Sequence, residues 1–207
     1  MRAVYLVDDD DIIRNLLRDV LSGIPDLLLF PFRAGNDFIA ALPDLAGGVL
    51  MLDMKMPGMS GLDVLEAIHR QEGRFTTILM TSRPAVADVV KCIKMGAYDF
   101  LEKPIDPDAL VDCIESALES LWETRAKLAA RAEAMKRINR LTDRELGILD
   151  LMVDGLPNKV IADRLSLSTR TVEVHRASLM AKIGAESLSA AVRMAVLANP
   201  YILQELP

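Results

Sequence analysis

Acidic side chains gather at two places in the first half of the sequence. Four consecutive aspartates, Asp8–Asp11, follow the apolar stretch AVYLV, and Asp53 follows the apolar stretch VLML. Carboxylates that share one site do not all stay ionised without a cation, and Mg²⁺ prefers oxygen ligands and also accepts a phosphate oxygen. A hydroxyl (Thr81) and an ammonium group (Lys103) follow two later apolar stretches. Together these groups suit phosphoryl transfer, with Asp53 as the nucleophile that forms an acyl phosphate.

The elements that must position these residues alternate between strand and helix. Strand-like apolar runs occupy residues 3–7, 27–32, 49–52, 76–80 and 98–101, and helical patterns lie between them. This alternation predicts a doubly wound, flavodoxin-like α/β domain with a five-stranded parallel sheet. Pro31 favours an edge position for the second strand, which gives the order 2-1-3-4-5. Strands one and three are then neighbours, so Asp8, Asp9 and Asp53 converge. Asp10 and Asp11 are expected to begin a helix, where acids are favourable.

The second half of the sequence has no strand signal. Residues 106–140 read as one long helix or two joined helices, with a heptad seam of Ile114, Leu118, Leu121, Leu128, Ala132 and Met135, interrupted by Arg125. Two interpretations stay open: a last helix packed on its own sheet, or a dimer seam. Four short helices follow Arg140, and Thr142 with Glu145 forms a capping box at the first. We therefore predict an α/β domain at 1–120, a helical linker at 121–140 and a small all-α domain at 141–207.

Composition and charge narrow the function classes. The net charge is −6, but residues 1–115 carry 19 acids and 11 bases (−8), whereas residues 116–207 carry 11 acids and 13 bases (+2). This asymmetry favours two domains with different partners. The N-terminal apolar run is too short for a signal peptide or a membrane span, so we expect a cytoplasmic protein with no membrane partner. Cys92 and Cys113 are expected to be reduced.

The first domain resembles the receiver domain of bacterial two-component response regulators. The stretches that carry the resemblance are VDDD, LDMKMPGMSG, MTSRP and GAYDFLEKP. It implies that Asp53 accepts phosphate from a sensor histidine kinase. It also implies that Asp9, Asp53 and the Lys55 carbonyl bind Mg²⁺, with Asp8 acting through water. Thr81 and Phe100 would form the switch pair, although Phe100 departs from the tyrosine that receivers often carry. The SRP stretch after Thr81, which contains Arg83, departs from the less bulky loop expected of a receiver.

The second domain resembles a LuxR-type helix-turn-helix, as in the FixJ and NarL regulators. GLPNKVIADRL and TVEVHRASLMAKIG carry this resemblance, which places a helix at 168–183 in the DNA major groove. A helical wheel puts Val172, Leu179 and Ile183 in the core. It puts the following residues on the opposite, base-reading face: Arg170, Glu173, Val174, Ala177 and Ala181. Phosphate contacts are expected from Lys159, Thr171, Ser178 and Lys182. A homodimer seam on the last helix would use Val192, Ala195 and Val196.

These observations favour a DNA-binding transcriptional regulator that is switched by phosphorylation of Asp53, and not a metabolic enzyme. A phosphatase that uses an aspartyl phosphate would need a second acid two residues after the nucleophile, where this chain has Lys55. A small-molecule sensor would need an apolar pocket in place of the charged strand ends. A regulator that works without phosphate stays open as the alternative.

Overall fold

The computed structural model describes residues 2–82 and 86–199. Their contacts divide the chain into two compact units, of which the first ends at Arg125 and the second begins at Ala126. Helix α5 (Pro107–Ile138) crosses this boundary without a break and contains most of the predicted linker. The boundaries at residues 120 and 140 stay predictions. Among the described residues, no helix combines the length and the apolar character that a membrane span requires.

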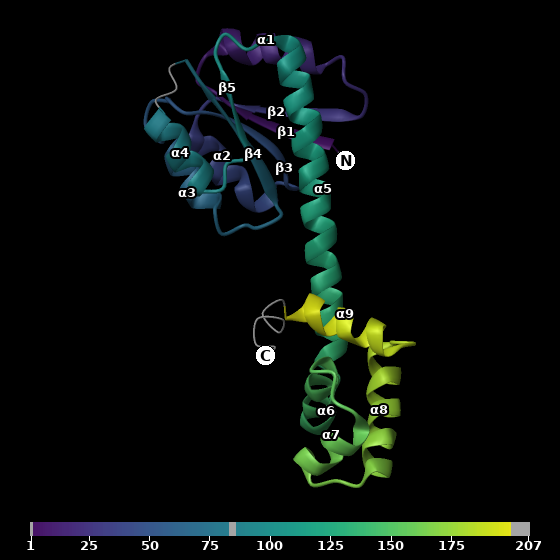
Figure 1. The fold of residues 1–207 in the computed structure, drawn as a ribbon. Coiled ribbons are helices and arrows are strands. Elements are labelled where there is room, and N and C mark those ends of the chain that lie inside the picture. Colours follow the sequence, from purple (N-terminus) through teal and green to yellow (C-terminus); the bar gives the residue numbers. More distant parts are fainter. Residues whose placement is uncertain (1, 83–85, 200–207) are drawn as a thin grey trace. The chain divides into compact units, whose positions relative to one another are not determined.

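The first unit is built on a parallel sheet (Figure 1). Its strands are β1 (Arg2–Val7), β2 (Leu27–Phe32), β3 (Gly48–Asp53), β4 (Phe75–Thr81) and β5 (Asp99–Glu102). The order across the sheet is β2-β1-β3-β4-β5, which confirms the predicted topology. Pro31 lies on the edge strand β2, where one side of the strand needs no ladder hydrogen bonds. Strand β3 is buried along its whole length, as its continuous apolar run predicted.

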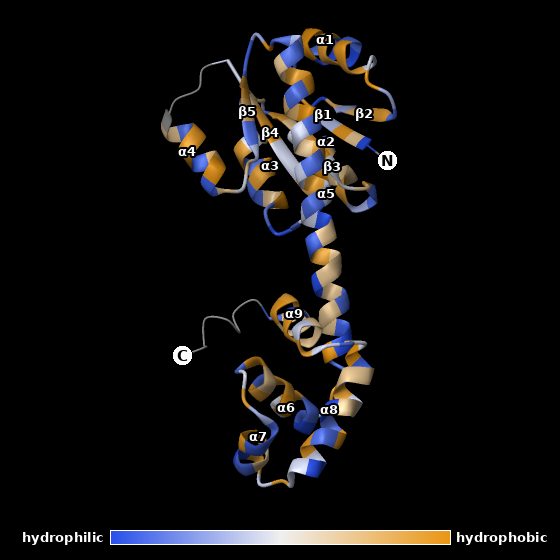
Figure 2. Ribbon diagram, turned by 45° about the vertical axis from the view of Figure 1, so that its right-hand side comes forward, coloured by the Kyte–Doolittle hydropathy of each residue, from blue (hydrophilic) through white to orange (hydrophobic). Residues whose placement is uncertain are grey.

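Helices cover both faces of this sheet. They are α1 (Asp11–Leu21), α2 (Gly35–Ala41), α3 (Gly61–Ile68), α4 (Val86–Lys94) and the first part of α5, with a short 3₁₀ helix at Leu42–Asp44. Leu17 of α1 packs with Leu110 of α5 on one face. Phe38 of α2 and Val64 of α3 pack on the other face. Figure 2 shows the apolar and polar residues alternating along α1, as expected of a helix with one buried side.

Helix α5 remains attached to the first unit as far as Arg125. The first positions of the predicted seam are buried beneath the sheet: Ile114, Leu118 and Leu121. This half of the seam therefore packs on its own domain, as the first interpretation held. The Arg125 guanidinium donates hydrogen bonds to the carbonyl oxygens of Gly73 (2.9 Å) and Arg74 (3.0 Å). Arg125, which interrupts the heptad, thus joins α5 to the loop before β4 through hydrogen bonds. The dimer interpretation of the later positions stays a prediction.

The second unit contains the four short helices that the sequence predicted. They are α6 (Asp143–Val153), α7 (Asn158–Leu165), α8 (Thr169–Ile183) and α9 (Leu188–Ala198). The Thr142–Glu145 capping box is present, and Ser168 caps α8 by accepting from the Thr171 N–H. Gly184, with φ 69°, ends α8 in the left-handed conformation that glycine adopts without strain. One core joins these helices, and Ile148, Val172 and Leu179 lie within it.

Candidate functional site

The carboxyl ends of the strands bring the predicted acids together. In the pairing of β1 with β3, Val7 lies opposite Leu52. Asp8 and Asp53, the next residue on each side, are therefore neighbours at the carboxyl edge of the sheet. One carboxylate oxygen from each of Asp8, Asp9 and Asp53 lies within 4.8 Å of the others. Asp8 and Asp53 are buried, whereas Asp9 is exposed. The three carboxylates therefore form a cluster, which we call the acidic pocket, at the switch point between β1 and β3, where doubly wound sheets bind their ligands.

Lys103, which directly follows the edge strand β5, also lies in this pocket. Its ammonium group lies 2.7 Å from Asp8 Oδ2 and 3.0 Å from Asp53 Oδ1. The main-chain N–H of Lys103 donates to the Thr81 carbonyl oxygen at 2.8 Å, and this bond holds Lys103 beside the end of β4. A single ammonium group thus bridges two of the three carboxylates.

Burial and charge act on this pocket in opposite directions. Burial raises the pKa of Asp53, the Lys103 hydrogen bond opposes that rise, and the charges of Asp8 and Asp9 add to it. For Lys103, burial works toward a lower pKa, but the hydrogen bonds to Asp8 and Asp53 outweigh it and raise the pKa above its usual range. One ammonium group against three carboxylates leaves an excess of negative charge, which a divalent cation would offset.

The four consecutive aspartates have four different roles. Asp8 Oδ2 accepts from Lys103, and Asp8 Oδ1 accepts from the Asp10 N–H at 2.9 Å. Asp9 is exposed and adds a third carboxylate to the group of Asp8 and Asp53. Asp10 is the N-cap of α1 and accepts from the Ile12 N–H at 2.8 Å. Asp11 begins the helix and forms an ion pair with Arg14. Arg14 was not among the predicted site residues, although its position three residues after Asp11 on a helix is the available signal.

The acidic pocket fits Mg²⁺ by the chemistry of its donors. Mg²⁺ binds oxygens at about 2.0–2.1 Å and retains several waters. Opposite ligands are then about 4.2 Å apart, so oxygens spread over as much as 4.8 Å fit an ion that some carboxylates bind directly and others through water. Both oxygens of Asp8 already accept hydrogen bonds, which suits a contact through water. Lys55, whose carbonyl is a predicted ligand, follows β3 in the adjoining loop.

The predicted switch residues lie on β4 and β5. Thr81 is buried at the end of β4, beside the pocket. Phe100 is in β5, opposite Leu79, and its ring is partly exposed. The two side chains therefore differ in burial, and the predicted inward movement of the ring stays a prediction. Arg83 lies outside the described residues.

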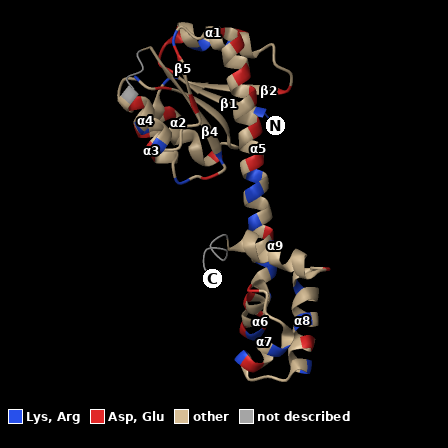
Figure 3. Cartoon of the chain, in the orientation of Figure 1, with Lys and Arg blue, Asp and Glu red and all other residues tan. Residues whose placement is uncertain are grey.

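A second candidate site is the outer face of α8. The residues predicted to be buried, Val172, Leu179 and Ile183, are buried. Each residue predicted on the opposite face is exposed: Arg170, Glu173, Val174, Ala177 and Ala181. Val174 is 63 % exposed, which is high for an apolar side chain and leaves it free to contact a ligand. Acidic and basic residues both occur along α8 (Figure 3), and the exposed face itself carries Arg170 and Glu173, so it differs from a uniformly basic surface.

Glu145 of α6 holds α8 in place through hydrogen bonds to its side chains. The sequence pattern had identified Glu145 only as part of a helix cap. Its side chain is 3 % exposed. Its carboxylate accepts from Lys182 Nζ at 2.6 Å, from Ser178 Oγ at 2.7 Å and from the Thr142 N–H at 2.8 Å. The Lys182 bond, with the others, lowers the pKa of Glu145 to about 2. Burial of the carboxylate is thus offset by donors from two helices.

These bonds correct part of the predicted phosphate contacts. A serine hydroxyl has one proton to donate and a phosphate oxygen only accepts, so Ser178, which donates to Glu145, is not a phosphate donor in this structure. Lys182 also binds Glu145 but retains two further N–H donors. Lys159 is exposed at the start of α7. The Thr171 hydroxyl lies 2.8 Å from Ser168 Oγ. The predictions for these last three residues stay open.

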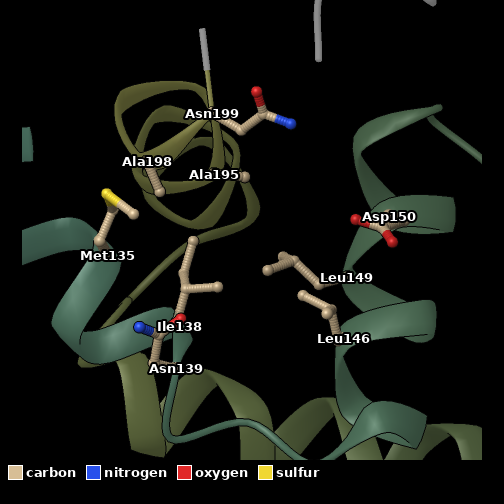
Figure 4. Close-up of a pocket in the computed structure, with 9 residues that line it drawn as sticks. All are labelled: Met135, Ile138, Asn139, Leu146, Leu149, Asp150, Ala195, Ala198 and Asn199. Atoms are coloured by element: carbon tan, nitrogen blue, oxygen red, sulfur yellow. The ribbon is translucent and has the colours of Figure 1, made fainter. Parts of the chain in front are cut away.

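The predicted seam on α9 also needs a correction. Ala195 is 3 % exposed and packs in the core of the second unit, so its placement on a dimer surface is wrong. The reason is that its face of α9 turns toward α6 and the end of α5. Figure 4 shows Ala195 above Ile138 and Leu149, around a cavity of about 310 Å³. Val192 and Val196 remain partly exposed.

Two family models match the sequence. The model described as "Response regulator receiver domain" matches residues 4–115, and the model described as "Bacterial regulatory proteins, luxR family" matches residues 139–195. The first covers the acidic pocket and the second covers α6, α7 and α8.

Known proteins resemble the chain over nearly its whole length. The transcriptional regulatory protein FixJ of Azorhizobium caulinodans is 39 % identical over 196 residues, which is 95 % of this chain and 92 % of that protein. FixJ of Rhizobium meliloti is 37 % identical over 194 residues, or 94 % and 95 % of the two chains. Among solved structures, the response regulator StyR matches with a TM-score of 0.78 at 33 % identity, over 94 % of this chain and 98 % of that one. Full-length FixJ from B. japonicum matches with a TM-score of 0.59 at 35 % identity, over 96 % and 98 %.

Proposed function

The chain belongs to the response regulators of two-component systems, of the FixJ/NarL type, and from this premise we propose that Asp53 is its phosphoryl acceptor. The chain is a phosphorylation-regulated transcription regulator in which a receiver domain is joined to a LuxR-type DNA-binding domain. It acts as a regulator and not as a metabolic enzyme; its own chemistry is phosphoryl transfer to Asp53 and hydrolysis from it.

The observation that carries this proposal is the position of Asp53 beside Lys103 in the acidic pocket. An Asp53 oxygen attacks the phosphorus of a phosphohistidine on the sensor histidine kinase. The new P–O bond forms as the P–N bond breaks, and the imidazole keeps the electron pair. Lys103, 3.0 Å from Asp53 Oδ1, meets the negative charge that the phosphoryl group brings. Asp8 is less suited to attack because both of its oxygens already accept hydrogen bonds.

Asp9, Asp53 and the Lys55 carbonyl would hold Mg²⁺, with Asp8 acting through a water. The support is the excess of carboxylates over lysine in the pocket and the exposure of Asp9. The bound ion supplies positive charge at the phosphoryl oxygens. Lys103 holds Asp8 and Asp53 in place through its two ion pairs.

Thr81 and Phe100 would carry the signal out of the pocket. The buried Thr81 hydroxyl turns toward the phosphoryl group, and the vacated space admits the Phe100 ring. Phenylalanine lacks the hydroxyl of tyrosine, so the coupling between the two residues is steric. The result is a shift between two receiver conformations.

The sensor kinase would dock over the start of α1. Ile12 is 77 % exposed and Leu16 lies one turn later on the same face, also exposed. Both are close in the chain to Asp9, so a partner that covers them brings its phosphohistidine toward Asp53. An exposed apolar pair beside a reactive pocket is suited to anchor a protein partner.

The DNA-binding domain would read promoter DNA with α8 in the major groove. Arg170 suits guanine, Glu173 suits the cytosine amino group, and Val174 suits a thymine methyl group. Lys159, Thr171 and Lys182 would contact phosphates around this face. Because the target is the bacterial chromosome, we place the protein in the cytoplasm.

A homodimer would form when the receiver is phosphorylated or DNA is bound. On the receiver, four exposed apolar side chains lie on α4 and around the edge strand β5: Val90, Ile93, Tyr98 and Phe100. Phe100 belongs to both this surface and the proposed switch, so phosphorylation would change the surface. Val192 and Val196 of α9 remain candidates for a contact on DNA. Two-fold symmetry would require paired half-sites at a fixed spacing.

Intact mass of the full-length protein, incubated with Mg²⁺ and a small phosphodonor, tests the acceptor. We expect one adduct of about 80 Da on the wild type that hydroxylamine removes, and none on Asp53→Asn. Asp19→Asn removes an exposed acid from α1 and should be phosphorylated normally. An adduct that persists in Asp53→Asn would contradict the assignment.

DNA binding of the same samples separates the two regulator hypotheses. Phosphorylation should strengthen binding to promoter DNA in the wild type and leave Asp53→Asn unchanged. Equal binding with and without a confirmed adduct would instead support a regulator that works without phosphate.

A further inference from the structure

Arg14 is a buried arginine next to the acidic pocket. The residue is 4 % exposed, and arginine is almost never buried this completely unless it is paired. It lies one turn into α1, and its main-chain N–H donates to the Asp10 carbonyl oxygen at 3.0 Å. Helical side chains lean toward the N-terminus of their helix, so the guanidinium reaches back to the residues that precede α1. Such burial indicates a specific role for this side chain.

The guanidinium holds two atoms of the aspartate run. One NH group donates to the main-chain carbonyl oxygen of Asp8, and the other donates to the Asp11 carboxylate. The Asp8 carbonyl belongs to the same planar peptide unit as the Asp9 nitrogen. Fixing this oxygen therefore fixes the orientation of the peptide that leads into Asp9.

The remaining polar groups of Asp8, its N–H and its carboxylate, also form hydrogen bonds. Its N–H donates to the Phe32 carbonyl oxygen at 3.2 Å, and its carboxylate accepts from Lys103 and from the Asp10 N–H. Asp9 differs, because its side chain is exposed. Its position relative to Asp53 depends on the backbone that Arg14 holds.

We propose that Arg14 is a positioning residue of the Mg²⁺ site, which presents the Asp9 carboxylate to the ion by fixing the Asp8–Asp9 peptide. This inference rests on the proposed magnesium site of the receiver. Arg14 does not touch the ion; it acts through the backbone. Groups that orient metal ligands in this way typically change metal affinity 10- to 100-fold when they are removed.

A purely electrostatic role of Arg14 and a positioning role predict opposite effects of its removal on Mg²⁺ binding. A guanidinium beside four aspartates repels a cation, so if Arg14 acted only by charge, its removal would strengthen Mg²⁺ binding. If it positions Asp9, its removal weakens binding. Lysine keeps the charge but lacks the planar fork that reaches two acceptors at once. Arg18, one turn later in α1, is exposed and bonded to Asn15, so it provides a matched charge control.

Titration of the full-length protein with Mg²⁺, followed by backbone amide NMR shifts around the pocket, measures the affinity directly. We expect Arg14→Met to bind Mg²⁺ about tenfold more weakly than the wild type and Arg14→Lys to be weakened as well. Arg18→Met should match the wild type. Spectra recorded without Mg²⁺ establish that each variant is folded, and Arg14→Lys decides the question if Arg14→Met does not fold.

Three results would overturn the proposal. Unchanged affinity in Arg14→Met means that Arg14 does not position the site. Tighter binding in Arg14→Met with normal binding in Arg14→Lys means that it acts by charge alone. A wild-type protein that binds no Mg²⁺ removes the magnesium site itself, and the positioning role with it. Only this last result also contradicts the proposed function.

Discussion

Replacement of Glu145 by glutamine should loosen the packing of α6 and α8 within the DNA-binding domain. The carboxylate is 3 % exposed and accepts hydrogen bonds from Lys182, Ser178 and Thr142. A carboxyl whose pKa is about 2 in the folded chain and 4.5 in the unfolded chain contributes about 3 kcal/mol to the free energy of unfolding at neutral pH. Lys182 is 37 % exposed, so solvent screens part of its bond. We therefore expect Glu145→Gln to lower the free energy of opening of α6 and α8 by about 2 kcal/mol.

Hydrogen exchange of the full-length protein, resolved by peptide mass spectrometry, measures this change locally. A loss of about 2 kcal/mol corresponds to roughly 30-fold faster exchange of buried amides in α6 and α8. Peptides from the receiver serve as the internal control, and fluorescence of Trp122, the single tryptophan, reports on the first compact unit, which ends at Arg125. Lys182→Met should reproduce most of the effect, and the double variant should add little to it.

The pH dependence gives an independent check. The folded-state pKa of Glu145 is depressed, so its contribution is present above the unfolded value of 4.5 and is lost as the pH falls from there toward about 2. Exchange in α6 and α8 should therefore accelerate over this range in the wild type, after correction for intrinsic rates, and less so in Glu145→Gln. Equal protection of both proteins at neutral pH would refute the reasoning, as would identical pH profiles.

Three other substitutions test particular contacts. Val174→Lys should weaken specific DNA binding about 5- to 30-fold in fluorescence anisotropy without lowering stability, because the side chain is exposed; an unchanged affinity would place the DNA on another face. Gly61→Ala should slow phosphorylation of Asp53 and destabilise the receiver by about 1–3 kcal/mol in urea unfolding, because a Cβ there would lie 2.4 Å from the Asp53 carbonyl oxygen. Gly147→Ala is the matched control: its Cβ meets nothing within 4 Å, and the change should stabilise α6 by about 0.5–1 kcal/mol. Ala195→Glu should destabilise the DNA-binding domain by several kcal/mol in thermal unfolding, whereas Val192→Glu should not, since only Ala195 lies in the core.

The receiver fold and its pocket could be predicted from the sequence because both follow from local patterns and topological rules. Apolar runs mark the strands, Pro31 marks an edge, and parallel strands place their carboxyl ends together. Asp8, Asp53 and Lys103 each directly follow a strand or lie within one residue of its end, so the fold determines where they meet. The buried and exposed faces of α8 followed from helical periodicity in the same way.

The tertiary structure decided which polar groups serve as partners within each domain. Ser178 looked like a phosphate ligand because periodicity places it on a flank of α8, but its partner Glu145 lies 33 residues earlier in the chain. Ala195 looked exposed because α9 is apolar on more than one side, and only the packing of α5 and α6 shows which side is covered.

The hydrogen-bond partners of Arg14 could not be predicted from the sequence either, although they lie only three and six residues away in the chain. The sequence shows an arginine three residues after an aspartate, which is the spacing of an ordinary surface ion pair. Only the folded chain buries its guanidinium against the Asp8 carbonyl oxygen. The sequence by itself thus determined the strand order, the meeting of the acids at the strand ends, and the buried and exposed faces of α8, because periodicity and strand order are encoded locally. The hydrogen-bond partners of Glu145 and Arg14 required the tertiary structure, because burial and the direction of a side chain depend on how the elements pack.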